Sequence, residues 1–247
     1  MRQSRASSLL RGVSGKSFFR RWLQRGLLLL LALFLLVQAW YFAHILAWRW
    51  FEPSSTAFMD ARLAELHEDN PKARLRQQWV DYPKISNNLK RAVIAAEDAK
   101  FLEHEGFDWE GMQNALEKNL RKGRVVAGGS TISQQLAKNL FLSGEKSVIR
   151  KGQEALITLM IEGVLPKRRI LELYLNLIEW GDGVFGAEAA SRHYYGVSAA
   201  QLSPSQAAWM AGIVPNPRYY DGGPATSALN RRVARIQRDM SVVQAPR

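Results

Sequence analysis

The sequence contains no cysteine among its 247 residues. A disulfide, a thiolate nucleophile and a Cys-ligated metal are therefore excluded, although this absence does not decide the redox compartment. The GxxxxGK[ST] and GxSxG patterns are also missing, so neither a P-loop nor a hydrolase nucleophile elbow is indicated. His67, His104 and His193 lack the spacing of metal ligands, and the glycines at 181–186 do not follow a predicted strand. The sequence therefore indicates no metal or dinucleotide site.

Acidic residues are absent from the first 25 positions, which carry seven Lys and Arg. The whole chain has 34 Lys and Arg against 22 Asp and Glu, a formal charge of +12. Without the N-terminal seven, 27 basic residues remain against 22 acidic ones, an excess of +5. Much of the basic character belongs to this tail, which argues against nucleic acid as a partner. The modest remaining excess suits an anionic substrate or an anionic lipid surface.

Residues 26–48 form a long apolar run that only Gln38 and His44 interrupt. As a helix, its 23 residues would extend about 35 Å, enough for a hydrocarbon core of about 30 Å. The alternative is a cleaved signal peptide, but its apolar region is normally shorter and no A-x-A site follows closely. We therefore predict an uncleaved anchor, with a basic cytoplasmic tail over 1–25 and the rest of the chain outside.

Helical periodicity dominates the remaining sequence. Residues 49–74 are predicted to be a juxtamembrane connection with a short helix near 57–68. Capping residues and apolar spacing predict further helices over about 86–106, 109–122, 131–141, 147–163, 167–179, 187–195 and 226–240. Capping boxes are expected at 131–134, 198–201 and 203–206. No convincing alternating strand pattern is present, so one mainly α domain is predicted.

The stretch around Glu97 is the first candidate for chemistry. If the helix continues to 106, Glu97, Phe101 and His104 share one face at i, i+4 and i+7. Small apolar side chains surround Glu97 in the sequence. Such surroundings tend to raise a carboxyl pKa, which suits a general acid or base. The alternative is a solvated acidic face with local pairs to Lys100 and Arg91.

Residues 128–139 predict a helix with two distinct faces. Ile132 and Leu136 begin an apolar stripe, whereas Ser130, Gln134 and Lys138 form a polar one. Hydrogen-bond donors at a helix N-terminus can bind phosphate or sugar hydroxyls. An ordinary solvated helix face explains the same spacing equally well.

A basic group follows at Lys146, Arg150 and Lys151, with Glu154 one turn later. Arg150 and Glu154 have the i, i+4 spacing of an ordinary surface pair, worth a few tenths of a kcal/mol. The cations could instead clamp a pyrophosphate.

A second carboxylate, Glu172, shares a predicted helix face with Asn176. Spacing alone favours a local Arg168–Glu172 pair over a functional role.

These blocks, in this order, resemble the peptidoglycan glycosyltransferases of family 51. The pattern E-D-x-x-F-x-x-H-x-G occurs at 97–106, G-x-S-T-I-[ST]-Q-Q at 128–135, R-K-x-x-E at 150–154 and K-x-x-I-L-E-x-Y-L-N at 167–176. An alanine-rich block before Tyr194-Tyr195-Gly196, followed by residues 202–215, also matches. Gln206 departs from the family, where many members carry Glu, but either residue can complete a capping box.

The resemblance covers roughly residues 75–235 and implies a lysozyme-like α fold with a head and a smaller, membrane-associated jaw. The predicted glycosyltransferase domain spans 75–240. With few residues after it, we expect a form without the transpeptidase domain of bifunctional relatives.

The implied activity is polymerisation of lipid II into β-1,4-linked glycan with release of undecaprenyl pyrophosphate. Glu97 would act as general base, and Glu172 would stabilise the donor sugar or order the cationic side chains. Fixed cations would stabilise the charge that builds on the leaving pyrophosphate. The substrate-binding residues implied by the motifs are Phe101, Ser130, Gln134, Lys138, Asn139, Lys146, Arg150, Lys151 and Glu154.

The resemblance also implies the ligands, partners and location of the protein. No cofactor is required; a divalent cation, Mg²⁺ or Mn²⁺, could bind near the pyrophosphate, although no dedicated metal-ligand set is visible. Expected partners are lipid II, the growing glycan strand, membrane lipid, moenomycin-type inhibitors and cell-wall or division proteins. The expected location is the bacterial inner membrane, with the catalytic domain in the periplasm.

Two other functions compete with this prediction. A lysozyme-like lytic enzyme would cleave finished glycan with one acidic Glu, and would need no cationic row. A non-enzymatic membrane scaffold would need neither the paired glutamates nor the ordered motifs.

Overall fold

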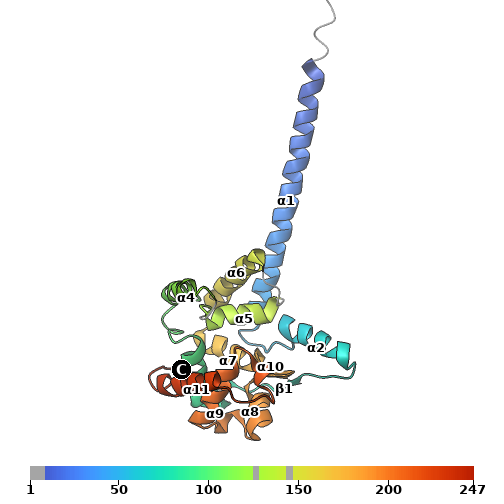
Figure 1. Cartoon of the computed structure of the whole chain (residues 1–247). Helices are drawn as coiled ribbons and strands as arrows, with labels where there is room; N and C mark the ends of the chain where they lie inside the picture. Colours follow the sequence, from blue (N-terminus) through green and yellow to red (C-terminus); the bar gives the residue numbers. More distant parts are fainter. Residues whose placement is uncertain (1–8, 125–127, 143–146) are drawn as a thin grey trace, which may run out of the picture. The chain divides into compact units, whose positions relative to one another are not determined.

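The computed structural model describes residues 9–124, 128–142 and 147–247. The chain divides into an N-terminal unit that ends at His44 and a compact unit, Ile45–Arg247. Helices dominate the described residues, so the predicted mainly α class is confirmed (Figure 1). Their division into lysozyme-like head and jaw lobes stays a prediction.

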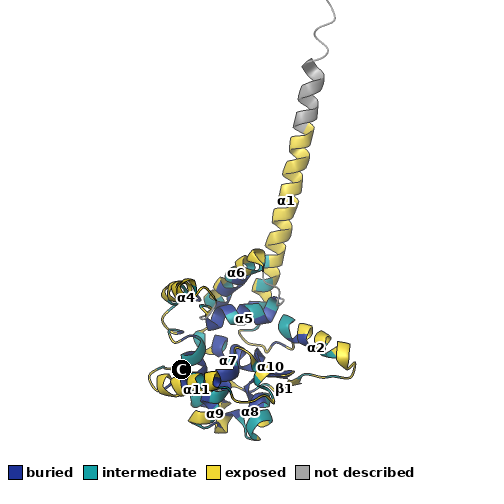
Figure 2. Cartoon of the chain, in the orientation of Figure 1, coloured by how far each residue is buried: buried dark blue, intermediate teal, exposed yellow. Residues whose placement is uncertain are grey.

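The long N-terminal helix α1 (Leu9–Ala47) contains the predicted apolar run. Its segment from Phe18 to Ala47 is long and apolar enough to cross a membrane, with a mean hydropathy of 2.2. The leucines between 27 and 36 are exposed along this helix (Figure 2). Such a surface is unfavourable in water and favourable in lipid. The helix begins at Leu9, so most of the predicted basic tail over 1–25 is helical.

The helices of the second unit largely follow their predicted bounds, because local caps fix their ends. Thr56, Asp108, Ser147 and Thr226 each accept a backbone N–H as an N-cap, and Gly123 ends a helix in the left-handed conformation. The three predicted capping boxes all form. The elements are α2 (Ala57–Asp69), η1 (Tyr82–Lys84), α3 (Asn87–Glu97), α4 (Trp109–Lys122), α5 (Ile132–Phe141), α6 (Val148–Val164), α7 (Lys167–Leu177), α8 (Ala187–Tyr195), η2 (Ala199–Gln201), α9 (Pro204–Ile213), α10 (Pro217–Tyr220) and α11 (Ser227–Asp239).

A small sheet was not predicted. It has the strand order β1 (Arg76–Gln77), β3 (Val184–Phe185), β2 (Glu179–Gly181), with β1 parallel and β2 antiparallel to β3. These strands are two or three residues long, too short for an alternating pattern to be recognised. Because β2 begins at Glu179, α7 ends at Leu177 rather than at the predicted residue 179.

Helix α7 is the central element of the core. All its residues from Leu173 to Leu177 are buried, and α5 packs against it (Figure 2). Helix α3 packs against α9 and α11, while α5 also packs against α6. The C-terminal end of α3 and the length of α5 are thereby held by the core, and both carry predicted site residues.

The helix that carries Glu97 is shorter than predicted. It ends at Glu97, and its C-cap Asp98 has non-helical backbone angles, with φ −163° and ψ 71°. The Asp98 carboxylate accepts the backbone N–H of Ile132, at the start of α5, and pairs with His104. The predicted common face of Glu97, Phe101 and His104 is therefore wrong, because a contact to α5 outweighs local helix propensity.

Candidate active site

Glu97 is held by two other helices. Its Oε1 accepts a hydrogen bond from Arg232 of α11 at 2.7 Å, and its Oε2 accepts one from Gln135 of α5 at 2.8 Å. The Glu97 side chain is only 11% exposed. The local pairs of the alternative interpretation do not form, because Lys100 pairs with Glu110 and Arg91 donates to backbone carbonyls near the C-terminus. Glu97 is therefore not part of a solvated acidic face.

Burial raises the pKa of the Glu97 carboxyl above its usual value. The hydrogen bond from Gln135 and the charge of Arg232 oppose this rise, whereas the neighbouring Asp98 adds to it. Gln135 is itself oriented, since its Oε1 accepts a hydrogen bond from the buried Tyr174 hydroxyl at 2.8 Å. A buried, oriented carboxylate with a raised pKa is suited to proton transfer.

A hollow of about 230 Å³ lies next to Glu97. One side is formed by residues 95–99 at the end of α3, and the other by Asp108, Gly111 and the loop 128–131. The exposed Ser130 belongs to this loop, so the structure brings the second predicted motif next to the first. A small polar group such as a sugar hydroxyl could approach Glu97 here.

Three basic side chains gather around a second buried carboxylate. Glu154 is 3% exposed and accepts hydrogen bonds from Arg150, at 2.9 Å, and from Lys151. Lys138 lies nearby on α5. Burial lowers the pKa of Lys138. The positive charges of Arg150 and Lys151 lower this pKa further, whereas the negative charges of Glu154 and Glu97 raise it. Both carboxylates therefore act on the charge of Lys138. The Lys138–Arg150–Lys151 group and Glu97 belong to one region.

Two guanidinium nitrogens in this region are buried without a hydrogen-bond partner among the described residues. They are Nε of Arg150 and Nε of Arg232. Buried donors are normally paired. Arg150 holds Glu154 and Arg232 holds Glu97. The region therefore keeps donor capacity for an anionic ligand.

Several predicted site residues have other contacts. Phe101 is fully buried below the Lys167 ammonium, so its ring lies in the core rather than on an accessible surface. Gln134 is buried, and its Oε1 accepts a hydrogen bond from the Thr131 backbone N–H. The next residue, Gln135, donates to Glu97 instead. Asn139 is 7% exposed and donates to the Gln135 carbonyl. Lys146 lies outside the described residues.

Glu172 lies on another side of α7. It accepts hydrogen bonds from the Tyr82 backbone N–H at 2.6 Å and from Arg169 at 2.7 Å. Tyr174, which reaches the Glu97 network, is two residues away and hence about 200° around the helix. The predicted local partner Arg168 instead lies over the Tyr82 ring. The second carboxylate of the Glu97 region is therefore Glu154.

Three residues of this network were missed in the sequence: Gln135, Tyr174 and Arg232. Gln135 and Tyr174 lie inside the recognised motifs, so their position in a motif was an available signal. Arg232 lies 135 residues from Glu97, in a basic amphipathic helix whose several arginines are indistinguishable by spacing.

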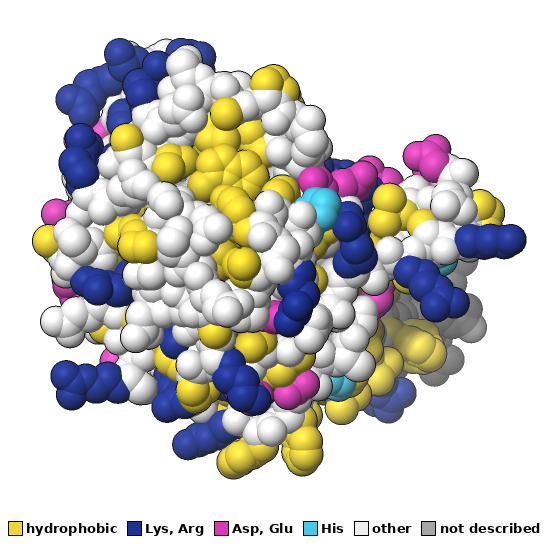
Figure 3. All heavy atoms as spheres, turned by 90° about the horizontal axis from the view of Figure 1, so that it is seen from below, with side chains coloured by type: hydrophobic (Ala, Val, Ile, Leu, Met, Phe, Trp, Pro, Cys, Tyr) yellow, Lys and Arg dark blue, Asp and Glu magenta, His cyan; other side chains and the backbone are white. Residues whose placement is uncertain are grey.

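Basic side chains are prominent on one face of the molecule. On the face seen from below in Figure 3, Lys and Arg side chains lie around much of the rim, and acidic side chains are fewer.

Among the described residues, no group of three or more His, Asp and Glu side chains could hold a metal ion.

Comparison with known proteins decides the family. The sequence profile described as "Transglycosylase" matches residues 63–241. This chain belongs to the transglycosylase family. The match includes Glu97, the basic group and Arg232, so the whole network described above lies within the family domain.

Full-length relatives agree with the family assignment. A biosynthetic peptidoglycan transglycosylase of Laribacter hongkongensis is 62% identical over 226 residues, covering 92% of this chain and 99% of the relative. Proteins of the same name from Dechloromonas aromatica and Thiobacillus denitrificans are 61% and 60% identical, each covering 92% of this chain and 98% of the relative. As a member of this family, the chain is a glycosyl-transferring enzyme.

Proposed function

We propose that this protein polymerises lipid II into the β-1,4-linked glycan strands of peptidoglycan and releases undecaprenyl pyrophosphate. The observation that carries the proposal is the shared region of Glu97 and the Lys138–Arg150–Lys151 group. A base for the attacking hydroxyl and cations for a leaving pyrophosphate are the two elements that this transfer needs.

The reaction begins at the acceptor. Glu97 removes the proton from the 4-hydroxyl of the acceptor GlcNAc, whose oxygen forms a bond to C1 of the donor MurNAc. The bond from C1 to the pyrophosphate oxygen breaks, and the pyrophosphate keeps the electron pair. Attack from the face opposite to the leaving group inverts the α-linkage to β. No nucleotide is consumed, because the diphosphate is already a good leaving group.

The basic residues act on the departing diphosphate. Lys138, Arg150 and Lys151 supply positive charge where negative charge develops, and the unpaired Nε of Arg150 adds a donor. Glu154 holds Arg150 and Lys151 in place, and Ser130 lines the hollow next to Glu97. Glu172 holds Arg169, so its implied role toward the donor sugar or the cationic side chains stays a prediction.

The N-terminal helix fits a substrate that is itself held in the bilayer. We propose a single span with the basic N-terminus in the cytoplasm and residues from 49 onward in the periplasm of the bacterial inner membrane, following the positive-inside rule. This topology places the catalytic unit on the side where peptidoglycan is built.

Purified full-length protein incubated with labelled lipid II tests the proposal. Electrophoresis should resolve long glycan products, and finished glycan offered as substrate should remain uncleaved. Cleavage of finished glycan without polymerisation would support the lytic alternative. No reaction with either substrate would support a scaffold.

A further inference from the structure

We propose that Arg232 of α11 is a positioning residue that holds the Glu97 carboxylate in its ionised, proton-accepting form. This inference rests on the proposed role of Glu97 as general base. Arg232 would act through Glu97 rather than on the departing diphosphate.

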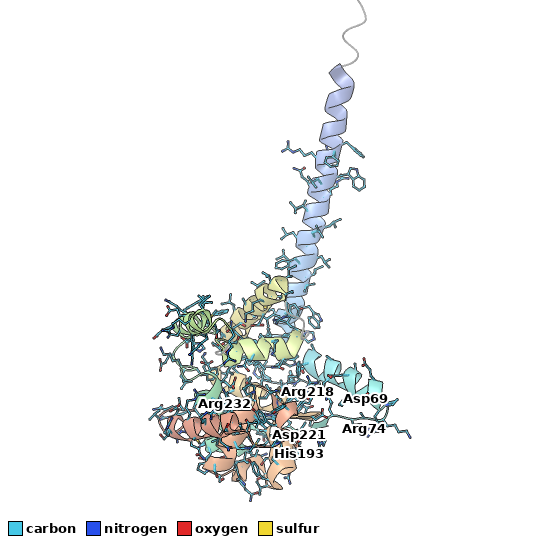
Figure 4. All side chains as sticks on the ribbon, viewed as in Figure 1. Asp69, Arg74, His193, Arg218, Asp221 and Arg232 are labelled. Atoms are coloured by element: carbon cyan, nitrogen blue, oxygen red, sulfur yellow. The ribbon has the colours of Figure 1, made fainter. Side chains whose placement is uncertain are left out.

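The geometry fixes both ends of the contact. Arg232 Nη2 lies 2.7 Å from Glu97 Oε1 and 3.4 Å from the Ala96 carbonyl oxygen. Helix α11 packs against both α9 and α3, its Leu229 and Ile236 are buried, and Figure 4 marks Arg232 on this helix. The guanidinium is therefore placed by the fold rather than by a flexible loop.

The two oxygens of Glu97 are held by different helices. Arg232 binds Oε1 and Gln135 binds Oε2. A carboxylate has about four lone-pair positions, so these two contacts orient the group and still leave acceptor capacity for a substrate hydroxyl. The hollow beside Glu97 offers the approach.

The surrounding charges explain why a cation is needed. Asp98, at the end of the same helix, disfavours the ionised form of Glu97. Helix α9, which packs against α3, carries no ionisable side chain. On α5 and α7, Lys138 and Tyr174 interact electrostatically with Glu97, but neither of these two side chains is hydrogen-bonded to it. Among the described residues, Arg232 is the cation in direct contact with Glu97.

Removal of this cation should favour the protonated acid. Burial already raises the Glu97 pKa, and Arg232 opposes that rise. Without Arg232 the carboxyl pKa should therefore increase, and a larger fraction of the enzyme should carry a neutral Glu97 that cannot accept a proton. The rate should fall most at low and neutral pH and recover as the pH increases.

The test compares Arg232→Gln with Arg232→Lys and Arg231→Gln in the full-length protein. Arg231 is the neighbouring arginine on α11 and is exposed, so its substitution removes the same charge without touching Glu97. We expect Arg232→Gln to reduce lipid II polymerisation about tenfold at neutral pH and to move the acid limb of the kcat/KM profile to higher pH. Arg232→Lys should restore most of the rate, and Arg231→Gln should leave the limb unchanged. An equal loss at every pH, with an unmoved acid limb, would show a purely structural role and overturn the proposal.

A second readout does not depend on activity. Titration of the Glu97 carboxyl by ¹³C NMR, with the signal assigned by its absence in Glu97→Gln, should give a higher midpoint in Arg232→Gln than in the wild type. An unchanged midpoint would overturn the proposal. If the wild type does not polymerise lipid II, the proposed function fails, whereas this titration still decides the role of Arg232. Arg232→Met, which keeps an apolar stem, replaces the Gln variant if the latter does not fold.

Discussion

Two arginine–glutamate contacts in this protein have similar chemistry but different surroundings. At the first, Arg232 holds Glu97; at the second, Arg62 of α2 holds Glu179 at the start of β2. Burial raises the carboxyl pKa of both glutamates. A raised pKa therefore does not distinguish a reactive carboxylate from a structural one in this fold.

The difference lies in how completely the arginines are paired. Arg62 donates from Nε to Glu179, from Nη1 to Glu65 and from Nη2 to Asp182. Arg232 leaves its Nε without a partner among the described residues, and Glu97 lines a hollow. The Arg62 cluster ties α2 to the sheet, whereas the Glu97 cluster keeps capacity for a ligand. Four variants can break or sharpen this comparison.

Glu97→Gln should have the largest effect. We expect lipid II polymerisation to fall by about 10³-fold, since a catalytic base contributes roughly 10²–10⁴-fold. The thermal unfolding midpoint should not decrease. Glu179→Gln is the matched control, and its rate per folded molecule should stay near that of the wild type. Near-normal polymerisation by Glu97→Gln would remove Glu97 from the mechanism.

Arg62→Met should act on stability instead of chemistry. It leaves Glu179 buried without its main cation, and breaking a buried pair by removing one partner costs about 3 kcal/mol. Urea unfolding measures the loss, while the rate of the remaining folded enzyme should be unchanged. A stable variant with reduced activity would contradict the purely structural role of this cluster.

Lys138→Ala should reduce polymerisation about 10²-fold, because one fixed cation facing the leaving group is lost. Binding of a moenomycin-type phosphoglycolipid should weaken in parallel, measured by calorimetry. The exposed Lys118 of α4 supplies a control substitution. Unchanged inhibitor affinity in Lys138→Ala would place Lys138 outside the phosphate-binding region.

Tyr174→Phe should have the smallest effect, a loss of about tenfold or less. The phenyl ring preserves the core packing, but the Gln135 amide loses the hydroxyl that orients it, and a neutral hydrogen bond contributes about 1 kcal/mol. Steady-state kinetics on lipid II should show the loss in kcat, with the unfolding midpoint little changed. Wild-type kinetics would mean that the backbone alone orients Gln135.

Local signals predicted much of the fold. Caps such as Ser86, Asp108 and Thr131 bind backbone groups two or three residues away, so their helices start where the sequence indicates. The end of α3 could not be predicted in this way. It depends on the bond from the Asp98 carboxylate to Ile132, 34 residues further along the chain.

The candidate site residues depend on local signals in the same way. Glu97, Lys138 and Arg150 were recognisable because their motifs are contiguous in sequence. Their partners depend on the tertiary fold. In the structure Gln135, rather than the predicted Gln134, contacts Glu97, and Arg232 also binds it. Likewise, the spacing that suggested an Arg168–Glu172 pair does not reveal that Arg169 takes this position.

The last residues of the chain are part of the scaffold under α3. Arg91 donates to the carbonyl oxygens of Ser241 and Val243, and the Tyr82 hydroxyl donates to that of Pro246 at 2.6 Å. Trimming the chain after Asp239, or replacing the residues that follow it with an affinity tag, would remove these contacts from η1 and from the helix that ends in Glu97. Expression vectors for this enzyme should therefore carry their purification handle at the other terminus.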